Sequence, residues 1–196
     1  AIADNGQGMA GTAFGVKILP VRVLGKCGGF DSDILAGMRW AAGLGVPGVP
    51  LNPNPARVLN LSLGGSGVCN AASGYPAVIA EVRAVGASVV VAAGNSAGQA
   101  VQLPANCEGV IAVAGLRHVG TKVGFSDLGP NIGIAAPAGN CVNMADNEPC
   151  LYPILSSSNS GTQRPNAGGS TWTDAYVYSV GTSFAAPIVA GTAALM

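Results

Sequence analysis

Charged side chains are scarce in this sequence. Only 9% of its 196 residues are Asp, Glu, Lys or Arg, against about 25% in an ordinary soluble domain. The nine basic and nine acidic residues cancel, so composition favours neither nucleic acid nor an anionic membrane as a partner. No apolar run reaches the ~18 residues of a transmembrane helix. We therefore expect a monomer that binds neither nucleic acid nor membrane.

Histidine is nearly absent, which limits both metal binding and acid–base chemistry. The single histidine, His118, lies in a polar turn between two strand-like segments, and we expect it at the surface. The sequence has no CxxC pair and no histidine at metal-ligand spacing, so we expect no zinc site.

The five cysteines have two interpretations. They are either buried free thiols or disulfides formed in an oxidising compartment. Disulfides are favoured because Cys141 and Cys150 bracket a polar loop, while Cys69 and Cys107 each follow a strand-like segment. The odd number leaves Cys27 either free or paired outside this chain.

Glycine is abundant, at 30 of 196 residues, about twice the usual share. This suits tight turns and close backbone approaches. Apolar, strand-like segments alternate with helical ones, which predicts one α/β domain with a parallel sheet covered on both faces. The predicted strands are 16–24, 57–63, 87–93, 109–114 and 132–136. One predicted helix is capped by Asp31 or Ser32, a second spans 76–85 with Pro76 in its first turn, and a third begins at Ser183. Residues 141–176 read as irregular loop with short strand pieces. The last helical pattern stops without a cap, so we expect an excerpt of a longer protein.

The segment GTSFAAPIVAG at 181–191 has the pattern of a nucleophile site. Ser183 follows a glycine turn and opens an Ala-rich helix, whose first turn offers unpaired N–H groups and a partial positive charge to an anion. Pro187 is expected in the first turn, where its missing N–H loses little. A plain N-cap serine is the alternative, and on the local pattern alone it is the commoner one.

Two further segments place polar groups at strand ends. VVVAAGN brings Asn95 to the carboxyl end of a strand, where α/β folds bind ligands. The Asn95 amide is either a donor to an oxyanion or an ordinary turn residue. LNLSLGG at 59–65 is either an edge that pairs with an extended peptide or an internal strand and its turn.

Taken together and in this order, these segments resemble the subtilisin-like (subtilase) serine proteases. GTSFAAPIVAG is similar to the nucleophile signature, VVVAAGN to the oxyanion segment and LNLSLGG to the substrate-binding strand. Residues 4–11, 16–23, 124–127 and 134–139 also resemble family segments, so the resemblance covers essentially the whole chain. The cysteine pattern is most similar to the secreted proteases of Gram-negative bacteria.

The resemblance implies a fold and an activity. The fold would be a three-layer α/β arrangement with a mostly parallel central sheet and helices on both faces. Residues 1–196 would be a partial peptidase catalytic domain that lacks N-terminal strands and C-terminal helices. The full-length protein would be a secreted serine endopeptidase in which Ser183 forms the acyl-enzyme, while the Asn95 side chain and the Ser183 N–H hold the oxyanion.

The resemblance also implies the substrate site and its partners. The substrate would be a protein or peptide, and a propeptide would belong to the precursor. Small apolar walls suggest a bulky apolar side chain in the specificity pocket. The substrate-binding residues would be Ser62, Leu63, Gly64, Ala92, Ala93 and Gly94.

Cysteine pairing and ion binding follow from the resemblance as well. It implies Cys69–Cys107 and Cys141–Cys150 disulfides, with Cys27 paired to a cysteine before Ala1. The chemistry would need no cofactor. A structural calcium ion is an option in the loop 4–9, where Asp4 and Asn5 are candidate ligands; a solvated loop is the equal alternative.

One departure from the family pattern is large. The catalytic Asp and His, expected in an Asp-(Thr/Ser)-Gly turn and a His-Gly-Thr-His helix, are absent from this sequence. We expect them before Ala1 and expect this chain alone to be inactive. An α/β-hydrolase esterase would need GxSxG around Ser183, which is not there. A non-catalytic binding or structural domain descended from a protease is the alternative from another class.

Overall fold

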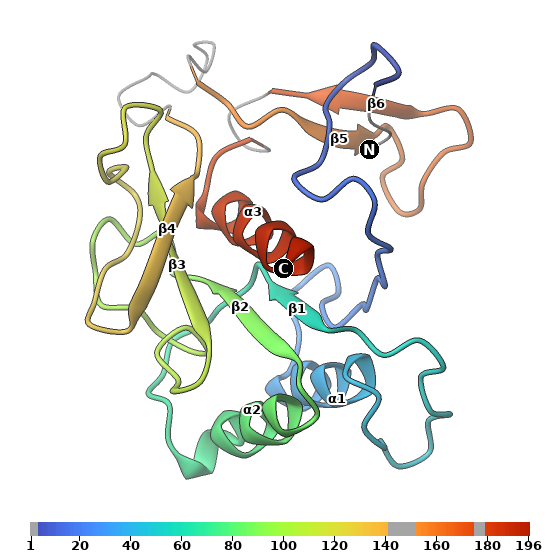
Figure 1. Cartoon of the computed structure of the whole chain (residues 1–196), viewed down its shortest axis with the longest axis vertical. Coiled ribbons are helices and arrows are strands. Elements are labelled where there is room, and N and C mark those ends of the chain that lie inside the picture. The colour runs from blue at the N-terminus through green and yellow to red at the C-terminus, as the bar shows by residue number, and fades with distance from the viewer. Residues whose placement is uncertain (1–3, 141–151, 175–178) are drawn as a thin grey trace.

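The central element is a four-stranded parallel sheet with the strand order β1-β2-β3-β4 (Figure 1). The computed structural model describes residues 4–140, 152–174 and 179–196. The strands are β1 (Val58–Leu61), β2 (Ser88–Ala92), β3 (Ile111–Leu116) and β4 (Ile132–Pro137). The helices are α1 (Asp31–Ala41), α2 (Tyr75–Ala84) and α3 (Thr182–Leu195), with a short 3₁₀ turn η1 (Ala71–Ser73). An antiparallel pair, β5 (Ser156–Asn159) and β6 (Ser170–Thr173), lies apart from the sheet.

Strand β2 shows why the sheet is covered on both faces. Val89 and Val91 belong to the core cluster that contains the buried residues of α1 and α2. Val90 and Ala92 belong to the cluster that contains the buried residues of α3. An apolar side chain is therefore needed at every position, as is typical of a parallel strand buried on both faces. The predicted three-layer α/β arrangement is confirmed (Figure 1).

The segment 16–24 differs from the prediction of a buried strand. It is not a strand, because none of the described residues forms a hydrogen-bonded ladder with it. Leu19, Val21 and Val23 pack against the α1–α2 core cluster, whereas Ile18 is 84% exposed. Buried and exposed side chains alternate here as in a half-buried strand. The sequence pattern could not reveal that no neighbouring strand among the described residues pairs with this segment.

The beginnings of the first two helices show one wrong and one confirmed prediction. Phe30, and neither Asp31 nor Ser32, is the N-cap of α1, and its side chain makes no capping bond. The Asp31 carboxylate instead accepts a 2.9 Å hydrogen bond from the Tyr75 hydroxyl of α2. Pro76 lies in the first turn of α2, as predicted. None of the described helices has the length and hydropathy to cross a membrane.

Candidate active site

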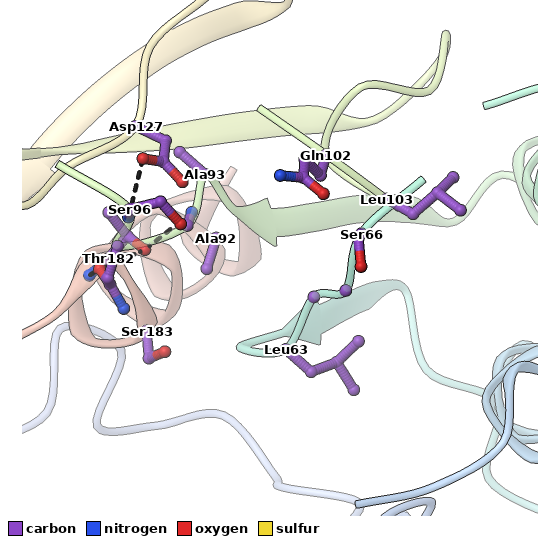
Figure 2. Close-up of a pocket in the computed structure, with 14 residues that line it drawn as sticks. Leu63, Ser66, Ala92, Ala93, Ser96, Gln102, Leu103, Asp127, Thr182 and Ser183 are labelled. Atoms are coloured by element: carbon purple, nitrogen blue, oxygen red, sulfur yellow. Dashed lines mark hydrogen bonds between the residues drawn. The ribbon is translucent and has the colours of Figure 1, made fainter. Parts of the chain in front are cut away.

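The carboxyl ends of β1 and β2 open onto a cavity of about 370 Å³ (Figure 2). This is the edge at which parallel α/β sheets bind ligands. Segments distant in sequence line it: the turn after β1, the end of β2, residues 102 and 103, Asp127, and the start of α3. The predicted site residues among them are Leu63, Gly64, Ala92, Ala93, Gly94, Asn95 and Ser183.

The side-chain amide of Asn95 is held in one orientation by Thr182. Its Oδ1 accepts hydrogen bonds from the Thr182 backbone N–H at 2.9 Å and from the Thr182 hydroxyl at 3.0 Å. A backbone N–H can only donate, so the atom it contacts is the amide oxygen. The Nδ2 group is thereby left as a donor, and none of the described residues accepts a hydrogen bond from it.

Thr182 is anchored on both sides. Its side chain is fully buried, and its Oγ1 also accepts a 3.1 Å hydrogen bond from the Gly94 N–H. One hydroxyl therefore connects the start of α3 to the turn that carries Asn95.

Gly181 lies close to the two expected oxyanion donors. A Cβ on Gly181 would lie 3.5 Å from Asn95 Nδ2 and 3.7 Å from the Ser183 backbone nitrogen. Gly181 also has a φ of 141°, a region that side chains other than glycine's rarely enter. The Ser183 N–H lies in the first turn of α3, where intrahelical partners are lacking. Both expected donors thus lie within van der Waals distance of one point beside Gly181, and the backbone conformation is what favours glycine there.

Ser62 is not among the residues that line the cavity, but it contacts Ser183 directly. Its hydroxyl donates a 2.7 Å hydrogen bond to the Ser183 carbonyl oxygen. Pro187 lies inside α3 and has no N–H to give to that carbonyl four residues earlier. The prediction that Pro187 costs little because it is in the first turn is therefore wrong: the proline frees the Ser183 carbonyl, and Ser62 satisfies it.

His118 and Asp127 are not a base and its partner. His118 is exposed at the turn after β3 and stacks on Tyr152, with ring centroids 3.5 Å apart. Its surface position was predicted correctly, and it is not among the cavity-lining residues. Asp127 does line the cavity, but its Oδ1 accepts the Ser96 backbone N–H at 2.8 Å. Among the described residues that line the cavity with Ser183 and Asn95, none is a histidine.

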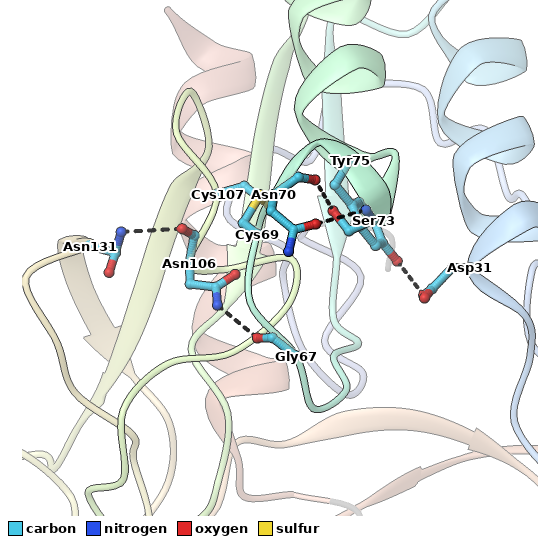
Figure 3. Close-up of a disulfide and its surroundings, with 9 residues drawn as sticks. All are labelled: Asp31, Gly67, Cys69, Asn70, Ser73, Tyr75, Asn106, Cys107 and Asn131. Atoms are coloured by element: carbon cyan, nitrogen blue, oxygen red, sulfur yellow. Dashed lines mark hydrogen bonds between the residues drawn. A yellow bond between two sulfur atoms is a disulfide. The ribbon is translucent and has the colours of Figure 1, made fainter.

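A disulfide ties together two of the segments that form the cavity. Cys69 and Cys107 are bonded, as predicted (Figure 3). Nearby, the Gly65 N–H donates to the Leu103 carbonyl at 2.9 Å, and Asn106 Nδ2 donates to the Gly67 carbonyl at 2.9 Å. The turn after β1 and the segment around residue 103 are therefore fixed to each other.

The remaining cysteine and calcium predictions stay predictions. Cys141 and Cys150 lie outside the described residues. Cys27 is an exposed free thiol, and its expected partner would lie outside this chain. No cluster of three or more His, Cys, Asp or Glu side chains suited to a metal is found among the described residues. In the proposed calcium loop, Asn5 Oδ1 accepts the Gln7 N–H at 3.0 Å.

Sequence reasoning missed several residues of the site. Thr182 is one of them, and its position next to Ser183 in the sequence is the signal that could have found it. Ser66, Gln102, Leu103 and Asp127 also line the cavity. They reach it through loops, whose course no periodic pattern in the sequence reports.

The comparisons with known proteins agree with this geometry. The sequence model of the subtilase family matches residues 1–196. The chain belongs to the subtilase family. It is 44% identical over 197 aligned residues to the extracellular protease of Xanthomonas campestris pv. campestris and 42% identical to the extracellular basic protease of Dichelobacter nodosus. Both alignments cover 100% of this subtilase chain, but only 30% and 29% of those proteins.

Solved structures give the same result for the fold. A protease from Pseudoalteromonas arctica matches this subtilase chain with a TM-score of 0.87 at 45% identity, over 100% of this chain and 54% of that one. A cold-adapted subtilisin-like serine proteinase matches with a TM-score of 0.63 at 27% identity, over 96% of this chain and 57% of that one. The chain thus spans about half of these two solved structures and less than a third of the two extracellular proteases named above.

Proposed function

We propose that the full-length protein is a serine endopeptidase that hydrolyses peptide bonds through an acyl-enzyme on Ser183. The observation that carries the proposal is the orientation of Asn95, whose oxygen is occupied by Thr182 while its Nδ2 remains a donor beside the Ser183 N–H. Ser183 Oγ would attack the scissile carbonyl, and these two donors would hold the oxyanion that forms. The general base and its carboxylate partner would come from residues outside this sequence, so residues 1–196 alone would be inactive.

The substrate chain would lie along the turn after β1. Strand β1 is at one end of the described sheet, which leaves backbone groups for an extended peptide to pair with. Residues 62–64 would pair with the peptide on the acyl side, and residues 92–94 would form the opposite wall of the specificity pocket. No cofactor is needed in this chemistry; a structural calcium ion and a propeptide belong to the proposal as expectations.

The proposed location is outside the cytoplasm. The two relatives named above are called extracellular proteases, and the Cys69–Cys107 disulfide is of the kind that persists in oxidising compartments. We propose a secreted, monomeric enzyme that acts on proteins or peptides.

Fluorophosphonate labelling of the full-length protein tests the chemistry, with Ser183→Ala as the matched control. Labelling that disappears in the control supports an activated Ser183. The Asn95→Ala variant should lower kcat by about 10²–10³-fold, a magnitude measured for subtilisin, which belongs to the same family. A folded full-length protein that does not label would favour the alternative, a binding or structural domain derived from a protease.

The pocket preference is tested with a peptide library. Leu63, Ala92, Ala93 and Leu103 give the cavity apolar walls, so a bulky apolar side chain is expected at the position before the cleaved bond. Selection of Lys or Arg there would contradict this and would point to the Asp127 carboxylate as the selecting group.

A further inference from the structure

Asp127 is a buried carboxylate that the proposed chemistry does not use. Its side chain is only 3% exposed, and it lies beside the turn that carries Asn95 (Figure 2). A buried carboxylate is costly unless hydrogen bonds compensate its lost hydration. Its position next to the expected oxyanion donors therefore requires a reason.

The contacts of Asp127 are with the two residues that flank Asn95. Its Oδ1 accepts the Ser96 backbone N–H at 2.8 Å. Its own backbone N–H donates to the Gly94 carbonyl at 3.0 Å. A single residue thus holds the backbone immediately before and immediately after the oxyanion asparagine.

Gly94 is shaped to fit this carboxylate. Its φ is 110°, which favours glycine, and a Cβ at this position would overlap Asp127 Oδ2. The carboxylate therefore fills the space that the missing side chain leaves beside the turn. Gly94 and Asp127 thus pack directly against each other next to Asn95.

Hydrogen bonds of the neighbouring residues Ser126 and Lys122 fix the loop that carries Asp127. The neighbouring Ser126 is fully buried; its hydroxyl accepts the Gly115 N–H at 2.9 Å and donates to the Asp127 carbonyl at 3.1 Å. The Lys122 ammonium group donates to the carbonyl oxygens of residues 123, 124 and 126. Asp127 thus lies in a loop whose backbone is held by Lys122 and is hydrogen-bonded to strand β3 through Ser126.

We propose that Asp127 is a positioning residue of the oxyanion site. As a hydrogen-bond acceptor it fixes the turn 94–96 and thereby keeps the Asn95 amide directed at the oxyanion. This role rests on the proposed function. It requires that Asp127 act through Asn95 and that acceptance of the Ser96 N–H, not negative charge, be the essential property.

The test is steady-state kinetics of variants of the full-length protein. The single variants are Asp127→Ala, Asp127→Leu, Asp127→Asn and Asn95→Ala, and the double variant combines Asp127→Ala with Asn95→Ala. Loss of the acceptor in the Ala and Leu variants should lower kcat about 10–100-fold with KM changed less than about threefold, since small misplacements of catalytic groups cost up to ~10²-fold. Asp127→Asn keeps an acceptor of the same shape and should restore most of kcat. Asp33→Ala, at an exposed position in α1, is the matched control and should have no effect.

The double variant separates positioning from general damage. If Asp127 acts through Asn95, the double variant should be no slower than Asn95→Ala alone, within about threefold. Reductions in kcat that multiply, or an Asn variant as slow as the Ala variant, would overturn the proposal. Failure of both Ala and Leu variants to fold would also overturn it, because the carboxylate would then be needed for the fold. Lack of turnover in the unmodified protein would instead refute the proposed function itself.

Discussion

The hydrogen bond from Ser62 to the Ser183 carbonyl allows a sharp prediction about Pro187. Ser62 supplies the donor that the missing N–H of Pro187 cannot. An intramolecular hydrogen bond contributes about 0.5–1.5 kcal/mol net. Because Ser62 is exposed and water can partly replace it, we expect Ser62→Ala to lower the free energy of unfolding by about 1 kcal/mol or less.

Replacement of the proline should abolish that cost. Pro187→Ala restores an N–H four residues after Ser183, so the carbonyl regains its helical partner. In the Pro187→Ala background, Ser62→Ala should therefore cost close to nothing, which gives a coupling free energy of about 1 kcal/mol between the two positions. Urea unfolding of the four proteins would measure it, in a Ser183→Ala background that prevents self-digestion.

The result that would refute this reasoning is additivity. If Ser62→Ala has the same effect when Pro187 is present as it has in the Pro187→Ala background, the Ser62 hydroxyl is not compensating for the proline. A matched control is Ser66→Ala, an exposed serine of the same turn, which should show no coupling to Pro187→Ala.

Three further predictions concern the full-length protein. Thr182→Val removes the hydroxyl that donates to Asn95 and accepts from the Gly94 N–H. We expect the free energy of unfolding to fall by about 1–3 kcal/mol and kcat to fall by up to ~10²-fold, as when a catalytic group is misplaced. An unchanged kcat would contradict the orientation of Asn95. Replacing Cys69 and Cys107 by Ser opens a loop with a sequence separation of 38 and should lower the free energy of unfolding by about 2–4 kcal/mol; equal chemical denaturation midpoints would argue against this disulfide. Burial and the hydrogen bond to Asp31 raise the pKa of Tyr75, so its contribution to stability is complete below the unfolded-state pKa of about 10 and is lost as the pH rises above it. The difference in free energy of unfolding between the unmodified protein and Tyr75→Phe should shrink as the pH is raised from about 9 to about 11. A difference that stays constant would contradict the burial of the phenol.

Much of the fold was predictable because its signals are local. The predicted strands 57–63, 87–93, 109–114 and 132–136 all overlap strands of the sheet. The clearest case is β2, which is apolar from Val89 to Ala92 because both of its faces are buried. The error at 16–24 has the same origin: an apolar alternation reports burial of one side, whereas a strand also requires a neighbour to pair with.

The start of α1 shows a different limit of local reasoning. Asp31 has the residue type of a helix cap, but a tertiary partner 44 positions away, Tyr75, takes its carboxylate. Pro187 was likewise judged from its place in the helix alone. The structure shows that its consequence falls on the Ser183 carbonyl and is met by Ser62, 121 positions away.

The sequence by itself determined the family, through the resemblance of runs such as GTSFAAPIVAG to subtilase segments, and its apolar runs located the strands of the sheet; it also predicted Ser183 and Asn95 as site residues. Only the tertiary structure decided how Asn95 is oriented, that Thr182 holds it, and that Asp127 lies behind its turn. The physical reason is that hydrogen bonds within a helix or along a strand follow a fixed period in the sequence, whereas hydrogen bonds between loops depend on the tertiary fold of the whole chain.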